Sequence, residues 1–101
     1  METIAQNKQE IIALIAVDMR NRKLVMGLEQ AGLHAENFYA DLTEIILLKM
    51  GFDEVSDDTF NWYQETMEEL IDLNVSVFMS HKNELALKMY EQLVFQRLVN
   101  G

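Results

Sequence analysis

Apolar residues recur at intervals of three and four along nearly the whole chain, and this spacing is typical of packed helices. The pattern is clearest from Ser56 to Met79. At about 100° per residue, one side of a helix there would carry Phe60, Tyr63, Met67, Leu70, Ile71, Asn74 and Phe78. The other side would carry Asp58, Glu65, Glu68, Glu69 and Asp72. We therefore expect an amphipathic helix with one apolar and one acidic face.

The composition agrees with a helical fold. The chain has 101 residues, no proline and four glycines, so it lacks the residues that β-hairpin turns need. It also has no cysteine, which excludes disulfides and thiolate metal sites. We predict an all-α protein: one domain spanning residues 1–101, folded as a compact bundle of four to five mostly antiparallel helices.

The first half of the chain predicts two helical regions. An amphipathic helix runs from Glu2 to Met19, and its pattern resumes after Arg20–Lys23, either beyond a kink or within one long helix. Gly32 is a typical residue for ending that region. A second helix is expected over residues 35–50, with Gly51 as its stop.

The second half predicts two more helices. Ser56 is a good N-cap, and two aspartates follow it in the first turn, where the helix dipole favours negative charge. The end of this helix stays open, because residues 74–83 include β-branched and capping residues that weaken a helix without stopping it. We expect a last helix from about His81 to Val99. The helices that start at Ala35 and Ser56 are expected at the centre of the bundle.

The negative charge is strongly localised. The net charge is −9, and the segment between Met50 and His81 holds eight of the 17 acidic residues and no lysine or arginine. Phosphate backbones and anionic membranes both reward basic residues, so we expect neither a nucleic acid nor a membrane as partner. A protein with a basic surface suits this charge better.

The acidic face supplies the candidate contact residues. Glu65 and Glu69 lie four residues apart, as do Glu68 and Asp72, and such like-charged pairs repel in an isolated helix. Trp62 lies at the border of the same face, where an aromatic side chain can anchor an interface. We predict that the partner-binding residues are Trp62, Glu65, Glu68, Glu69 and Asp72.

A basic cluster precedes this region in the chain. Arg20, Arg22 and Lys23 are three of the eight basic residues. We expect them to meet the acidic face of a neighbouring helix or second subunit, or to cap the end of the first helix.

The sequence lacks the usual signatures of catalysis. It has no Gly-x-Ser-x-Gly turn, no glycine-rich phosphate loop and no Glu-x-x-His pair of the di-iron bundles. A helix-turn-helix around Gly32 would present Glu36, Asp41 and Glu44 to phosphates, which electrostatics disfavours. We expect no catalytic residues, no metal and no cofactor, and we interpret the chain as a non-enzymatic interaction module of the inhibitor, immunity or adaptor type.

Two alternatives stay open. Wide apolar faces at Ile45–Leu48 and Leu85–Leu98 could pair across a two-fold axis, which would make the protein a homodimer or another homo-oligomer of structural role. A helical enzyme or small-ligand binder would instead use polar groups in an apolar pocket. Its candidate lining residues are Tyr39, Tyr63, Asn74 and Tyr90.

The sequence also bears on location. The amino terminus has no basic region followed by a signal-peptide core, and the longest apolar runs, such as Ile45–Leu48, are far shorter than a membrane span. We expect a cytoplasmic protein.

Overall fold

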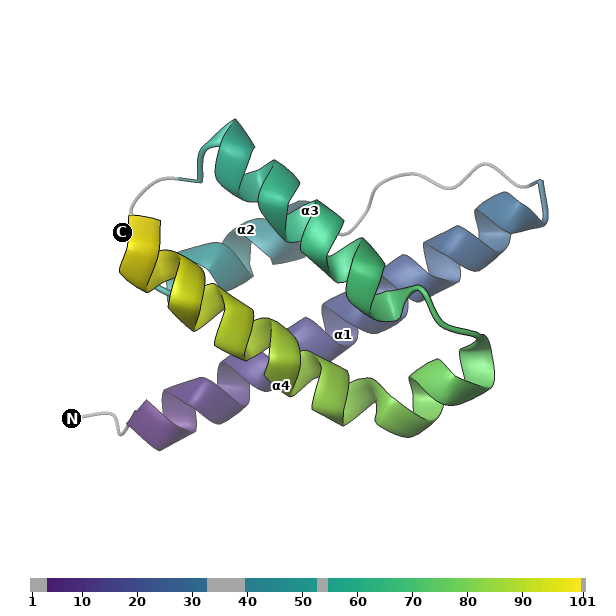
Figure 1. Ribbon diagram of the computed structural model, residues 1–101, viewed down its shortest axis with the longest axis horizontal. Helices are drawn as coiled ribbons and strands as arrows, with labels where there is room; N and C mark the ends of the chain where they lie inside the picture. Colours follow the sequence, from purple (N-terminus) through teal and green to yellow (C-terminus); the bar gives the residue numbers. More distant parts are fainter. Residues whose placement is uncertain (1–3, 33–39, 53–54, 101) are drawn as a thin grey trace.

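The structure, a computed structural model, describes residues 4–32, 40–52 and 55–100 (Figure 1). Within these ranges it is all-helical, with no strand and with four helices in a compact globule. They are α1 (Ile4–Gln30), α2 (Ala40–Lys49), α3 (Asp57–Ile71) and α4 (Val75–Asn100). The expected all-α class is confirmed, and the described part of the chain has four helices, the lower of the two expected numbers. The mostly antiparallel arrangement stays a prediction.

The two predicted glycine stops are confirmed. α1 is one continuous helix through the Arg20–Lys23 segment, and it ends at Gln30, two residues before Gly32, whose φ is +81°. α2 ends at Lys49, two residues before Gly51, whose φ is +93°. Glycine suits both positions because it adopts positive φ at little cost. The expected start of the second helix at Ala35 lies outside the described residues.

The predicted N-cap of α3 is also confirmed, because the Ser56 hydroxyl accepts a hydrogen bond from the backbone N–H of Thr59 at 3.2 Å. The expected start of the last helix near His81 is wrong. α3 stops at Ile71, and α4 begins six residues before His81, at Val75. Asn74 begins it: its side-chain oxygen accepts from the N–H of Val77 at 2.9 Å, as an N-cap does.

The centre of the fold is α1 rather than the two helices expected there. α1 packs against each of the other three helices, most extensively against α4, while α3 also packs against α4. Figure 1 shows α1 and α4 crossing each other. The core between the helices consists of Ile11, Ile15, Met19, Ile46, Leu47, Tyr63, Met67, Ile71, Phe78, Leu85, Ala86, Met89 and Leu93.

A buried polar network joins α1, α2 and α3. Asp18 and Arg22 form an ion pair on α1, with 3.0 Å between Oδ1 and Nε, and both side chains are buried. The guanidinium of Arg22 also donates to Thr43 Oγ1 on α2 and to Gln64 Oε1 on α3, each at 2.7 Å. The phenolic hydroxyl of Tyr63 donates a hydrogen bond to Asp18 Oδ2 at 2.6 Å. α2 and α3 therefore each contribute at least one hydrogen-bond partner to the pair.

The positions of Asp18 and Arg22 follow a spacing that is visible in the sequence, although their charges argue against burial. Ile11, Ile15, Asp18, Arg22 and Val25 follow one another at spacings of four and three residues, and all five are buried. That is the spacing of one continuous helix face. Asp18 and Arg22 thus occupy core positions of an apolar stripe, and their charges are compensated by each other and by the neighbouring helices.

Burial also affects the protonation of the network. It raises the pKa of the Asp18 carboxyl, and the Arg22 charge and the hydrogen bonds from Tyr63, Arg22 and Thr43 act in the opposite direction. Burial, reinforced by the Asp18 charge and its hydrogen bond, raises the pKa of the Tyr63 phenol well above its ordinary value. Tyr63 therefore stays a hydrogen-bond donor across the neutral pH range.

Replacing Thr43 by valine tests how much the network contributes to the free energy of unfolding. Valine keeps the shape of threonine but removes the hydroxyl that accepts from Arg22 and approaches Asp18 at 3.4 Å. We expect Thr43→Val to lower the free energy of unfolding by about 1–3 kcal/mol, measured by urea denaturation. Thr43→Ser, which keeps the hydroxyl and loses only a methyl group, should cost less. Equal stability of Thr43→Val and wild type would contradict this role.

The raised pKa of Asp18 predicts a specific pH dependence. The folded chain holds the Asp18 proton at pH values where the unfolded chain, with an aspartate pKa of about 3.9, has lost it. The contribution of Asp18 to stability should therefore fall as pH rises from about 4 through the raised pKa. Wild type should lose stability relative to Asp18→Asn over this window. NMR titration of the Asp18 carboxyl carbon in wild type gives an independent measurement, and a midpoint below the ordinary value would contradict the prediction.

Candidate functional site

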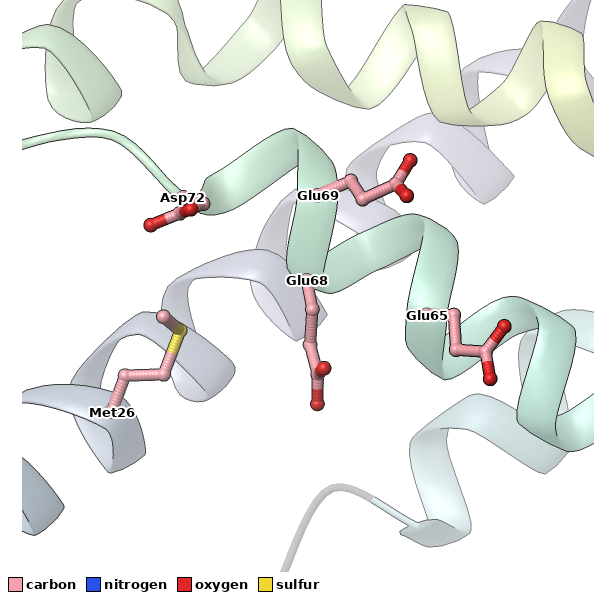
Figure 2. A pocket seen from close by; sticks show the side chains of 5 residues that line it. All are labelled: Met26, Glu65, Glu68, Glu69 and Asp72. Atoms are coloured by element: carbon pink, nitrogen blue, oxygen red, sulfur yellow. The ribbon is translucent and has the colours of Figure 1, made fainter.

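The predicted acidic face of α3 borders a hollow on the surface. Glu65, Glu68, Glu69 and Asp72 are all exposed, and together with Met26 of α1 they line a hollow of about 570 Å³. Figure 2 shows the carboxylate of Glu68 extending from α3 into the open space, with Met26 approaching from α1. Four of the five predicted contact residues therefore lie around one concave surface.

Trp62, the fifth predicted residue, is placed differently. Its side chain is half-buried and packs against the hydrophobic core, and it does not line the acidic hollow. The structure thus places Trp62 at the edge of the core, one turn before Glu65 on the same helix.

The four carboxylates have no cationic partner within the described part of the chain, where ion pairs join Asp18 to Arg22 and Glu10 to Lys49. This differs from the expected use of the basic cluster. Arg22 is buried with Asp18, and Lys23 donates to the carbonyl oxygens of Ile71, at 2.8 Å, and of Leu73. Lys23 therefore neutralises the carbonyl end of α3 rather than its carboxylates.

An apolar groove, which the sequence did not predict, lies near the acidic hollow. It has a volume of about 320 Å³ between α1 and the first turns of α4. Its large apolar side chains include Leu24, Val75 and Met79, which are 58%, 65% and 55% exposed. Arg20 and Lys23 line it as well. Sequence reasoning missed the groove because its two walls come from helices that are about 50 residues apart in the chain.

A third hollow joins the other two. It has a volume of about 450 Å³ and is lined by Lys23, Met26, Gly27, Gln30, Asp72, Leu73, Asn74 and Val75. Met26 and Asp72 also line the acidic hollow, while Lys23, Gly27 and Val75 also line the apolar groove. The three hollows therefore adjoin one another between the carboxylates of α3 and the start of α4, with Lys23 at the boundary of the joining hollow and the groove.

Gly27 lies among these hollows without an evident structural need for glycine. It sits inside α1, its φ is not positive, and a Cβ atom built on it would meet no atom within 4 Å. Glycine in a helix interior costs about 1 kcal/mol relative to alanine. At Gly27 the backbone of α1 is thus uncovered at the floor of the groove.

The opposite end of the molecule has a different character. Lys49 pairs with Glu10 at 3.1 Å, and Lys8 lies over the ring of Tyr90 at 5.6 Å. Lys49, Tyr90 and Arg97 line a smaller hollow of about 170 Å³ there. Three basic side chains, those of Lys8, Lys49 and Arg97, therefore lie at this end of the molecule.

The residues expected to line a small-ligand pocket are not brought together. Tyr63 is buried and bonded to Asp18, Asn74 caps α4, and Tyr90 lines the hollow at the other end. Tyr39 lies outside the described residues. Among the residues that the structure describes, no three histidine, aspartate or glutamate side chains are close enough to hold a metal ion. None of the described helices combines the length and apolar character that crossing a membrane requires.

Gly27→Ala tests whether the fold itself needs this glycine. Since the added methyl group meets no atom and alanine favours the helix, we expect the free energy of unfolding to rise by about 1 kcal/mol. For a domain of this size that corresponds to a melting temperature about 4–8 °C higher, measured by circular dichroism. A lower melting temperature would mean that Gly27 serves the fold in a way that its surroundings do not reveal.

Comparison with known proteins does not assign the chain to a family: no protein-family model matches it, and no curated protein or solved structure is significantly similar to it.

Proposed function

We propose that this protein is a non-enzymatic interaction module, of the inhibitor, immunity or adaptor type, that binds a basic surface of another protein through the acidic hollow. One observation carries the proposal. Glu65, Glu68, Glu69 and Asp72 line a single hollow, are exposed, and have no cationic partner among the described side chains. The expected cytoplasmic location is part of the same proposal.

The physical argument is electrostatic. Four like charges around one concave surface repel each other and attract cations from solution. A lysine- or arginine-rich surface would relieve this repulsion, and the opposite charges would speed association at low ionic strength. Trp62, half-buried beside the carboxylates, is the aromatic residue that we assign to the rim of the contact.

A homo-oligomer is the second candidate, and a separate observation favours it. On α4, Phe95, Leu98 and Val99 are 62%, 76% and 62% exposed. Ile45 and Leu48 of α2 are also exposed. Such apolar surface at the C-terminal end of α4 would be covered if two copies paired there. Sedimentation at high protein concentration tests this second candidate, since a strict monomer contradicts self-association.

Charge reversal tests the preferred function. For a partner isolated from the native cell, we expect affinity to fall as salt rises, and Glu65→Lys/Glu69→Lys to weaken binding by about tenfold or more at low salt. The matched control is Glu84→Lys/Glu91→Lys on α4, which makes the same change in net charge at two exposed positions away from the hollow. Equal loss in both variants, or binding that is indifferent to salt, would contradict recognition by the acidic hollow.

A further inference from the structure

We propose that the segment bound by this protein is a basic amphipathic helix, whose basic end lies over the acidic hollow and whose apolar end lies in the groove between α1 and α4. This inference rests on the proposed function and specifies its partner. It makes one binding surface of the acidic hollow, the joining hollow and the apolar groove.

The three hollows adjoin one another on the protein surface. The joining hollow shares Met26 and Asp72 with the acidic hollow, and Lys23, Gly27 and Val75 with the apolar groove. A partner held by the carboxylates therefore lies beside the joining hollow and, beyond Lys23, the apolar groove. A basic patch alone would fill only one end of this surface.

The lining of the groove favours an apolar occupant. Leu24 and Met79 face it from α1 and α4, and both side chains are more than half exposed. Leu28 and Phe78 complete an apolar lining. Contiguous exposed apolar surface of this kind marks an interaction site more often than single exposed residues do. A groove between two helices takes the apolar face of a third helix, through side chains one turn apart.

Gly27 leaves the surface of α1 open to a partner. Its conformation does not require glycine, and nothing occupies the space where a side chain would be. The missing side chain leaves the backbone of α1 open at the point where the joining hollow meets the groove. A partner backbone can approach closely at a glycine. A binding role of this kind would explain why a residue of low helix propensity stands inside α1.

Charge determines which end of the bound helix lies over each hollow. Arg20 is exposed and lines the apolar groove but neither of the other two hollows. Lys23 is held at the junction by the carbonyl oxygens of Ile71 and Leu73. Basic residues of a partner are therefore attracted to the end near Glu68 and repelled from the end near Arg20. The partner helix should be basic at one end and apolar at the other.

The test uses two synthetic helical peptides of about 18 residues, or about 27 Å of helix. The first carries leucines at every third or fourth position of its first turns and lysines in its last turns, where the helix dipole favours positive charge. The second has the same composition with lysines and leucines evenly mixed. Fluorescence anisotropy with wild-type protein should give at least about tenfold tighter binding of the first peptide. Equal binding of both peptides would overturn the proposed polarity.

Two protein variants separate this inference from the proposed function. Leu24→Ala/Met79→Ala removes apolar contact from exposed positions and should weaken binding of the first peptide by about tenfold at both low and high salt. Glu65→Lys/Glu69→Lys should weaken it chiefly at low salt. The control Phe95→Ala/Leu98→Ala truncates exposed apolar residues at the other end of α4 and should leave binding unchanged.

Each outcome has a distinct meaning. Loss of binding only in the glutamate variant would overturn the groove as part of the site and leave the acidic hollow as the binding surface. Loss in neither variant would overturn both proposals. Gly27→Leu, which fills the floor of the groove at a position where a helix accepts leucine, should weaken binding without loss of helix content. Conversion of a wild-type dimer to a monomer by Leu24→Ala/Met79→Ala would make a second copy the occupant and overturn the foreign helix.

Discussion

The buried ion pair of Asp18 and Arg22 is the interaction on which the arrangement of the first three helices depends. Removing two charges from water costs several kcal/mol, and their mutual attraction offsets this only if the remaining polar atoms are bonded. Those bonds come from Thr43 on α2 and from Tyr63 and Gln64 on α3. Within the described part of the chain, no buried side-chain nitrogen or oxygen lacks a hydrogen-bond partner. A different packing of the same helices would separate these groups, so the network favours one arrangement over its alternatives.

This use of charge inside the fold determines what the surface presents. Arg22 is committed to the interior and Lys23 to the carbonyl end of α3, so these two neighbouring cations do not neutralise the outer face of that helix. The carboxylates of α3 consequently lie around their hollow with no ion pair to a described side chain. Its bonds to the end of α3 also hold Lys23 at the junction of the hollows, between an acidic region and an apolar one. The interior network and the polarity of the proposed binding surface thus have a common origin.

The early end of α3 shapes the rest of that surface. Because α3 stops at Ile71 and Asn74 caps a new helix, Val75, Phe78 and Met79 belong to α4 and turn toward α1. In one uninterrupted helix from Ser56 to Met79, Phe78 would have extended the stripe of Tyr63, Met67 and Ile71. The break instead places the two ends of that stretch on different helices and opens a groove beside the carboxylates. The acidic and apolar features of one sequence segment become two neighbouring parts of one surface.

The sequence by itself determined the helical class, the glycine stops at Gly32 and Gly51, the cap at Ser56 and the acidic face of α3. Each of these follows from residues within a few positions of one another, because helix periodicity, capping and turn conformation are local. The tertiary structure decided that α1 is central, that Asp18 and Arg22 are core residues, and that Leu24 and Met79 share a groove. These features depend on pairings between residues far apart in the chain. A charged residue in an apolar stripe gives no local sign of whether a neighbouring helix will supply the bonds that allow its burial.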